Sequence, residues 1–467
     1  MVTILDVLHD KKLFAQLFKD QRTWHAWEVY LSALFGLPIR GEKDLELFRQ
    51  ATGLEEPPTV PARESYVICG RRSGKSYTSS ILATHLSVFK DWSPYLAPGE
   101  RGWVFIIATD KAQAGIIKGY ISGIFDRVKM LRPYVQRETQ EQIDLKNGIS
   151  IAVKPASFRG VRGYTLVAAI LEELSFYRSD ESANPDKEIV AAIRPALATC
   201  PESMLIGIST PYAKAGHLYD MYKRYHGKAD GPLIWVAPSR RMNSTLDPKM
   251  IERAVAEDPQ AARAEWEATF RDDISAFINL EAVEAAVIPG RLELPPLADE
   301  RYEAFIDPSG GSSDSFTMAI GHRGALGKVV IDAIRERRPP FTPSAVVAEY
   351  AELMKNYHIY RAKSDHYAGA WVPEAFKAHG ITIDSSDMSA SDYYLNVLPI
   401  ILNGTAELLD NKRLVAQFAS LERRVRPAGK DLITHPQGGG HDDICNSVSG
   451  VLVGLAKPAI RREIIWL

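Results

Sequence analysis

The stretch that decides the fold is SYVICGRRSGKS, residues 65–76. Its first five residues are mostly apolar and predict a buried strand, and a helix is predicted to begin at about Lys75. Glycines let the connecting backbone turn its N–H groups toward an anion, and the helix N-terminus adds a partial positive charge. This strand–loop–helix context predicts a phosphate-binding loop that comprises Gly70, Arg71, Arg72, Ser73, Gly74, Lys75 and Ser76.

The loop departs in one place from the usual pattern GxxxxGK[ST]. Cys69 stands at the first glycine position, and Gly70 comes one place late. A loop of this composition alone is also compatible with a chance turn, but the flanking strand and helix favour a nucleotide site. Lys75 is then expected to reach the β- and γ-phosphates of ATP, and Ser76 to offer its hydroxyl to Mg²⁺.

An acidic pair completes the expected ATPase chemistry. The apolar run LVAAIL, residues 166–171, predicts a strand that leads into Glu172 and Glu173. In phosphate-loop ATPases the first acid holds Mg²⁺, and the second polarises the attacking water. Glu172 stands where Asp is usual, so its carboxylate reaches about one bond further. Ser209 and Thr210 follow another apolar run and are candidates to sense the γ-phosphate, although Ser-Thr-Pro is also an ordinary turn.

Three arginines are candidates to stabilise the charge that develops on the γ-phosphate. Arg159 and Arg162 lie shortly before the acidic strand, and Arg72 lies inside the loop. The sequence does not choose among them, because such an arginine acts either in cis or from a neighbouring subunit.

Strands and helices alternate up to about residue 239, which predicts a parallel sheet covered on both faces. The 467 residues are enough for two or three domains. We expect a helical region that contributes to the ATPase over 1–60 and a P-loop ATPase domain of the ASCE type over 61–270. A linker over 271–300 and a second α/β domain over 301–467 are expected to follow.

Acidic residues recur in the second domain where a metal-dependent nuclease needs them. Asp307 and Asp365 end predicted strands, and Asp442 and Asp443 open the last predicted helix. Carboxylates that converge in this way hold two divalent ions for attack on a phosphodiester, and oxygen ligands favour Mg²⁺ or Mn²⁺. Each acid taken singly is equally compatible with a helix cap or a turn, and Asp314 is expected to serve a turn. Their order resembles that of ribonuclease H-like nucleases.

Bulk composition limits the classes of function. The formal net charge is −2, from 56 basic and 58 acidic residues, so contact with DNA must use local basic patches. The three cysteines lie far apart without CxxC spacing, which disfavours a disulfide framework or a zinc site. The N-terminus does not resemble a signal peptide, and no apolar run of about 18 residues predicts a membrane span.

The order of these motifs resembles the large terminase family of tailed phages, and within it the HK97-like branch. The resemblance spans nearly the whole chain through GRRSGKS, ISTPY, FIDPSGGSSDSFTMAIGHRG and GGGHDDICNSVSG. It implies an ATPase and metal-dependent endonuclease that packages viral double-stranded DNA in the host cell cytoplasm. The implied partners are the portal protein of a procapsid and a small terminase subunit. The implied assembly is a homo-oligomeric ring of five on the portal, with a monomer in isolation.

The same resemblance implies roles for individual residues. Lys75 and Ser76 bind nucleotide and Mg²⁺, and Glu173 is the catalytic glutamate. Asp307, Asp365 and Asp443 are metal ligands with Asp442 adjacent, and Gln21 and Trp24 contact adenine. Two other classes of function compete: an ATP-gated DNA repair or defence nuclease, and a structural protein derived from an inactive terminase. Packaging assays with procapsids and portal separate the motor from the gated nuclease.

Overall fold

The chain folds into two compact units. The computed structural model describes residues 2–156, 160–161, 163–179, 182–311, 314–365, 371–425, 431–436 and 441–456. The first unit comprises Met1–Arg178 and Asn184–Asp273, and the second comprises Ser179–Ala183 and Ile274–Leu467. The expected linker over 271–300 contains strand β9 (Ile274–Ala276) and helix α11 (Leu280–Ala286), and most of it belongs to the second unit.

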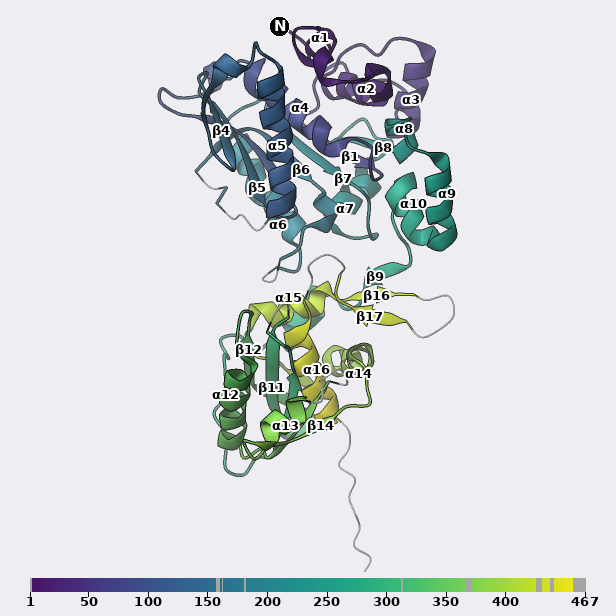
Figure 1. The fold of residues 1–467 in the computed structure, drawn as a ribbon. Coiled ribbons are helices and arrows are strands. Elements are labelled where there is room, and N and C mark those ends of the chain that lie inside the picture. The colour runs from purple at the N-terminus through teal and green to yellow at the C-terminus, as the bar shows by residue number, and fades with distance from the viewer. Residues whose placement is uncertain are drawn as a thin grey trace, which may run out of the picture. The chain divides into compact units, whose positions relative to one another are not determined.

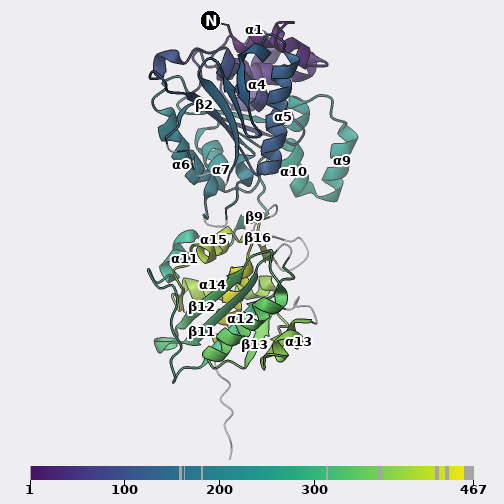
Figure 2. The ribbon, with the colours of Figure 1, turned by 60° about the vertical axis from the view of Figure 1, so that its left-hand side comes forward.

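An eight-stranded sheet forms the centre of the first unit (Figures 1 and 2). In spatial order its strands are β3 (Val135–Glu138), β4 (Gln142–Leu145), β5 (Ile149–Pro155), β2 (Gly102–Ala108), β6 (Thr165–Glu172), β7 (Met204–Ser209), β1 (Glu64–Cys69) and β8 (Leu233–Ala237). The six strands from β5 to β8 pair in parallel, whereas β3 and β4 extend the edge as an antiparallel hairpin. The strands β6, β7 and β1 are neighbours, so their carboxyl ends meet at one edge, where open α/β sheets bind ligands.

Helices cover both faces of this sheet, as its fully apolar strands require. On one face, a single hydrophobic cluster contains residues of the sheet together with residues of α1 (Ile4–His9), α2 (His25–Leu34), α3 (Glu42–Thr52), α4 (Lys75–Val88) and α5 (Lys111–Arg127). The other face packs against α6 (Pro185–Leu197) and α7 (Gly216–Tyr225). The short helices α8 (Ser239–Met242), α9 (Pro248–Glu257) and α10 (Pro259–Glu267) follow β8. The helices of the region 1–60 therefore share one core with the phosphate-loop helix α4.

A six-stranded sheet forms the centre of the second unit (Figure 1). In spatial order its strands are β14 (Thr382–Ser385), β13 (Arg361–Ser364), β10 (Tyr302–Asp307), β11 (Phe316–Arg323), β12 (Val329–Arg337) and β15 (Ala406–Glu407). The strands β10, β11 and β12 form an antiparallel meander, and β13 and β14 add in parallel on the other side of β10. A meander followed by parallel strands is the order expected of a ribonuclease H-like fold.

Two hydrophobic clusters flank this second sheet. One contains α14 (Ala390–Leu402), α15 (Lys412–Ser420) and α16 (Asp443–Ala456), and the other contains α12 (Pro343–Asn356) and α13 (Trp371–Lys377). A separate three-stranded sheet pairs β9 with β16 (Glu422–Arg424) and β16 with β17 (Leu432–Thr434). Helix α16 lies very close to β10 because Gly450 has no side chain: a Cβ there would stand 2.2 Å from Cγ of Phe305.

All three cysteines are free and buried: Cys69 and Cys200 in the first unit, and Cys445 in the second. Burial raises the pKa of the Cys69 thiol to about 11 and that of Cys445 well above its ordinary value. Among the described residues, no helix is long and apolar enough to cross a membrane.

Candidate functional sites

The phosphate loop joins the end of β1 to the start of α4 and is held by contacts from three directions. Gly74 has a φ of 98°, a conformation that suits glycine, and Arg72 has a φ of 60°. The indole N–H of Trp27 donates to the carbonyl of Ser73 at 2.7 Å, and the side-chain amide of Asn243 donates to the carbonyl of Arg72 at 2.8 Å. The N–H of Arg71 donates to the carbonyl of Glu265 at 2.6 Å. These contacts fix the loop before any ligand arrives.

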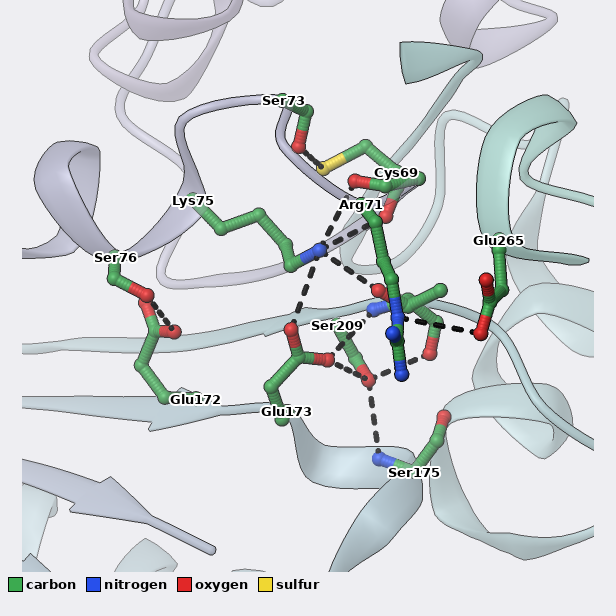
Figure 3. A network of polar contacts seen from close by, with 12 residues as sticks. Cys69, Arg71, Ser73, Lys75, Ser76, Glu172, Glu173, Ser175, Ser209 and Glu265 are labelled. Carbon is green, nitrogen blue, oxygen red and sulfur yellow. Dashed lines mark hydrogen bonds and ion pairs between the residues drawn. The ribbon is translucent and has the colours of Figure 1, made fainter. Parts of the chain in front are cut away.

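Lys75 lies at the centre of a polar network and is only 6% exposed (Figure 3). Its ammonium donates to the carbonyl of Gly70 at 3.0 Å and to Oγ1 of Thr210 at 2.7 Å. It also pairs with Oε1 of Glu173 at 3.2 Å. Burial is the largest single influence on Lys75 and lowers its pKa. The negative charges around it, of which that of Glu173 acts most strongly, and the hydrogen bond to Glu173 together outweigh burial, so the pKa is raised and the ammonium stays charged.

Glu172 ends β6 and is fully buried against α4. Ser76 donates its hydroxyl to Oε2 of Glu172 at 3.0 Å, and Ser79 donates to Oε1. Burial raises the pKa of Glu172 to about 7, although the hydrogen bond from Ser79 opposes that rise. The carboxylate therefore lies beside the hydroxyl that the sequence predicts as a Mg²⁺ ligand.

Glu173 follows directly in the left-handed conformation, with a φ of 52°. Its Oε2 accepts from the backbone N–H of Thr210 at 3.0 Å and from the hydroxyl of Ser209 at 3.4 Å. These three residues come from the ends of the neighbouring strands β6 and β7, so the two acids and the Ser-Thr pair meet at one sheet edge with Lys75.

The remaining residues predicted for this site have different surroundings. Arg71 and Arg72 are exposed, and Nε of Arg71 lies 3.3 Å from Oε1 of Glu265. Trp24 lies against the loop, since a Cβ on Gly74 would stand 3.0 Å from its ring. The side-chain amide of Gln21 donates to the Leu8 carbonyl at 3.2 Å and to Oε1 of Glu28 at 3.0 Å. Arg159 and Arg162 lie outside the residues that the structure describes.

Two residues at this site were missed by sequence reasoning. Ser79 stands three residues after Ser76 on α4, a spacing that places both hydroxyls on one helix face. The side-chain amide of Gln113, on α5, donates to Oγ of Ser76 at 3.3 Å. Helical spacing was a signal for Ser79, whereas only the fold brings Gln113 to the loop.

The second unit gathers the predicted carboxylates around the start of α16. Asp307 ends β10, Asp365 follows the neighbouring strand β13, and Asp443 begins α16. The side-chain amide of Asn446 donates to Oδ2 of Asp307 and to Oδ2 of Asp365, each at 2.9 Å. One buried group therefore connects the acids of two strands.

Asp443 and Asp442 have different partners. Oδ2 of Asp443 accepts from the backbone N–H of Ser315 at 3.0 Å, whereas Oδ2 of Asp442 accepts from the hydroxyl of Tyr394 at 2.8 Å. Burial raises the pKa of Asp443 to about 6 and also raises that of Asp442. Burial raises the pKa of Asp307 well above its ordinary value. The hydrogen bond from Asn446 lowers this pKa, whereas the charges of the nearby aspartates raise it further.

These raised pKa values reflect burial and, for Asp307 and Asp443, the charges of neighbouring aspartates. Asp307, Asp442 and Asp443 line a cleft of about 390 Å³ together with Ser309, Asp314, His435 and His441. Ligand atoms of Asp314, His441 and Asp443 lie within 4.8 Å of one another. Oδ1 of Asp365 is buried and has no hydrogen-bond partner among the described residues. A mainly oxygen donor set with an unpartnered buried oxygen fits a hard divalent cation such as Mg²⁺ or Mn²⁺.

Comparison with known proteins finds a family match over part of the chain. Residues 67–285 match the family described as terminase large subunit, T4likevirus-type, N-terminal. No curated protein matches the chain in sequence.

Solved structures of phage terminases are similar to the chain at low identity. The HK97 bacteriophage large terminase is 15% identical, with a TM-score of 0.38, over 90% of this chain and 96% of that one. The ATPase domain of the Thermus phage P74-26 large terminase is 18% identical, with a TM-score of 0.37, over 52% and 97%. The magnesium-bound large terminase nuclease of phage G20c is 17% identical, with a TM-score of 0.33, over 38% and 98%.

Proposed function

Since residues 67–285 match the model of the terminase large-subunit family, we propose that this chain couples ATP hydrolysis to the movement of viral double-stranded DNA and cuts that DNA at a second, metal-dependent site. The observation that carries this proposal is that the chain contains two separate sets of functional groups. The first unit holds Lys75 and Glu173 in contact at a phosphate loop, and the second holds an aspartate cluster linked through Asn446.

In the ATPase the loop from Gly70 to Ser76 binds the phosphates of ATP with Mg²⁺. Lys75 leaves Glu173 and binds the β- and γ-phosphates, because phosphate oxygens compete for the same ammonium. Glu173, held by the backbone of Thr210, is then free to take a proton from the attacking water. Ser76 and Glu172 hold Mg²⁺, which neutralises charge on the phosphates.

Other residues support this chemistry. Gln21 and Trp24 lie on the N-terminal side of the loop and are assigned to adenine. Arg72, Arg159 and Arg162 are the candidates for the arginine that stabilises the transition state, and their alanine variants, mixed with wild-type chain, separate action in cis from action in trans.

In the nuclease the ligands of two Mg²⁺ or Mn²⁺ ions are Asp307, Asp365 and Asp443, with Asp442 beside them. Bound ions of this kind activate a water and neutralise the scissile phosphate. The contact from the Ser315 backbone orients Asp443, and the Tyr394 hydroxyl restrains Asp442. The cleft beside these acids admits the phosphodiester.

The proposed setting is the host cell cytoplasm. There the chain binds the portal protein of a procapsid and a small terminase subunit. It forms a ring of five on the portal and is a monomer in isolation.

Packaging with purified procapsids and portal tests the proposal. ATP is expected to render added DNA resistant to external nuclease, and Lys75→Ala is expected to remove this protection. DNA-stimulated ATP turnover and DNA cutting without protection of DNA would contradict the motor and favour the ATP-gated repair or defence nuclease.

A further inference from the structure

Asn446 is a buried polar residue to which the sequence assigns no role. It lies on α16, only 3% exposed, three residues after Asp443. Its amide nitrogen is 2.9 Å from Oδ2 of Asp307 and 2.9 Å from Oδ2 of Asp365. A primary amide nitrogen carries two protons, so it can serve two carboxylates at once, which a hydroxyl cannot do.

The fold fixes the position of this amide. The N–H of Asn446 donates to the carbonyl of Asp442 at 2.7 Å, which sets the first turn of α16. One turn later Gly450 lets the helix approach Phe305 on β10. Residues four apart share a helix face, so this close approach also brings Asn446 onto the ends of β10 and β13.

The two hydrogen bonds leave particular oxygens without partners. Oδ1 of Asp365 and Oδ1 of Asn446 are both buried, and neither has a hydrogen-bond partner among the described residues. Buried oxygens normally have partners, and an unpartnered carboxylate oxygen beside further aspartates is a donor that suits a divalent cation.

We propose that Asn446 is a positioning residue of the nuclease, which fixes Asp307 and Asp365 through their Oδ2 atoms and leaves Oδ1 of Asp365 to a divalent cation. The inference rests on the proposed nuclease function. Groups that orient metal ligands contribute to affinity without contacting the metal, and their loss weakens metal binding by about 10- to 100-fold.

Titration of the full chain with Mn²⁺ tests this role through two measurements. Electron paramagnetic resonance reports bound Mn²⁺, and plasmid cleavage reports activity. For Asn446→Ala we expect the Mn²⁺ concentration at half-saturation to rise at least about tenfold in both measurements. We also expect cleavage to recover at high Mn²⁺ and ATP turnover to stay unchanged. The matched control is Ser447→Ala, whose hydroxyl is buried on the same helix but donates to the Ile444 carbonyl; it should titrate like the wild type.

A second variant keeps the volume of the side chain. Asn446→Asp replaces the donor with a further carboxylate, so without metal its thermal midpoint should fall below that of the wild type. Its midpoint should also rise more than the wild-type midpoint on addition of Mn²⁺. If Asn446→Ala does not fold, the thermal midpoints of Asn446→Asp with and without Mn²⁺ still test the proposal.

The outcomes separate this inference from the function on which it rests. Wild-type half-saturation in Asn446→Ala, or wild-type metal response in Asn446→Asp, would overturn the positioning role while the nuclease stands. A wild-type chain that neither binds Mn²⁺ nor cuts DNA would overturn the nuclease itself and this inference with it.

Discussion

Glu172 combines two opposing demands in one side chain. Burial favours its neutral form and raises its pKa to about 7, yet the proposed role as a Mg²⁺ ligand requires the ionised form. The folded chain therefore binds this proton more tightly than the unfolded chain, in which the pKa is near 4.5. As the pH rises from 4.5 through 7, ionisation of Glu172 opposes folding, and its contribution to stability is lost.

Glu172→Gln is expected to stabilise the first unit at high pH. The amide resembles the neutral acid, so the variant should match the wild type near pH 4.5. At pH 8 it should exceed the wild type by up to about 3 kcal/mol in free energy of unfolding. Thermal unfolding at the two pH values measures this. An equal difference at both pH values would show that Glu172 does not titrate between them.

Glu173→Gln is expected to separate nucleotide binding from hydrolysis. The amide keeps the size of the side chain but cannot accept a proton from water, so ATP turnover should fall by about 10²- to 10⁴-fold. Because the neutral amide competes less for Lys75, nucleotide affinity should be kept or should rise. Fluorescent-nucleotide binding and single-turnover hydrolysis measure the two effects, and loss of affinity together with turnover would contradict this role.

Among single residues, the sequence predicted the functional side chains that belong to a motif or that follow a predicted strand. Lys75, Ser76 and the acidic pair lie together as their positions after parallel strands predict. The sequence did not identify Asn446, because a polar residue in a helix looks the same whether it faces solvent or two carboxylates. Its partner Asp365 is 81 residues distant, and only tertiary packing joins them.

Among the elements, helix α16 packs very closely against its neighbour β10. A Cβ on Gly450 would overlap the ring of Phe305, so the helix would have to move away from β10. Gly450→Ala is therefore expected to destabilise the second unit by about 1–3 kcal/mol and to weaken Mn²⁺-dependent cutting.

Thermal unfolding and plasmid cleavage measure these effects, with ATP turnover expected to remain. Gly119→Ala on α5 is the control, because a Cβ there has no neighbour within 4 Å. Gain of helix propensity should leave that variant as stable as the wild type or more so. If Gly450→Ala behaved like the control, close packing of α16 would not matter.

Strand–helix alternation predicted the parallel sheet of the first unit, because each βαβ unit is encoded locally. The small sheet of β9, β16 and β17 was not predicted. The residues of β9 pair with a strand about 150 positions later, at Ser275 and Arg423, and nothing in the adjacent sequence signals this. Short edge pairings of this kind depend on the whole fold.

In the whole molecule, the phosphate-loop residues lie in the first unit and the aspartate cluster lies in the second. Lys75→Ala is therefore expected to remove ATP turnover and to leave Mn²⁺-dependent cutting of DNA, whereas Asp365→Ala should do the reverse. Parallel assays of phosphate release and plasmid cleavage on each full-length variant measure this. If either substitution removed both activities, the division of labour between the units would be wrong.

The buried thiols of Cys69 and Cys445 allow the opening of each unit to be measured separately. Cys69 closes β1 immediately before the phosphate loop, and Cys445 precedes Asn446 in α16. A thiol-specific reagent needs an exposed thiolate, and burial suppresses both exposure and ionisation. The rate at which each cysteine is alkylated therefore reports how often its own unit opens, so opening of the motor and of the nuclease can be timed separately in one unmodified chain.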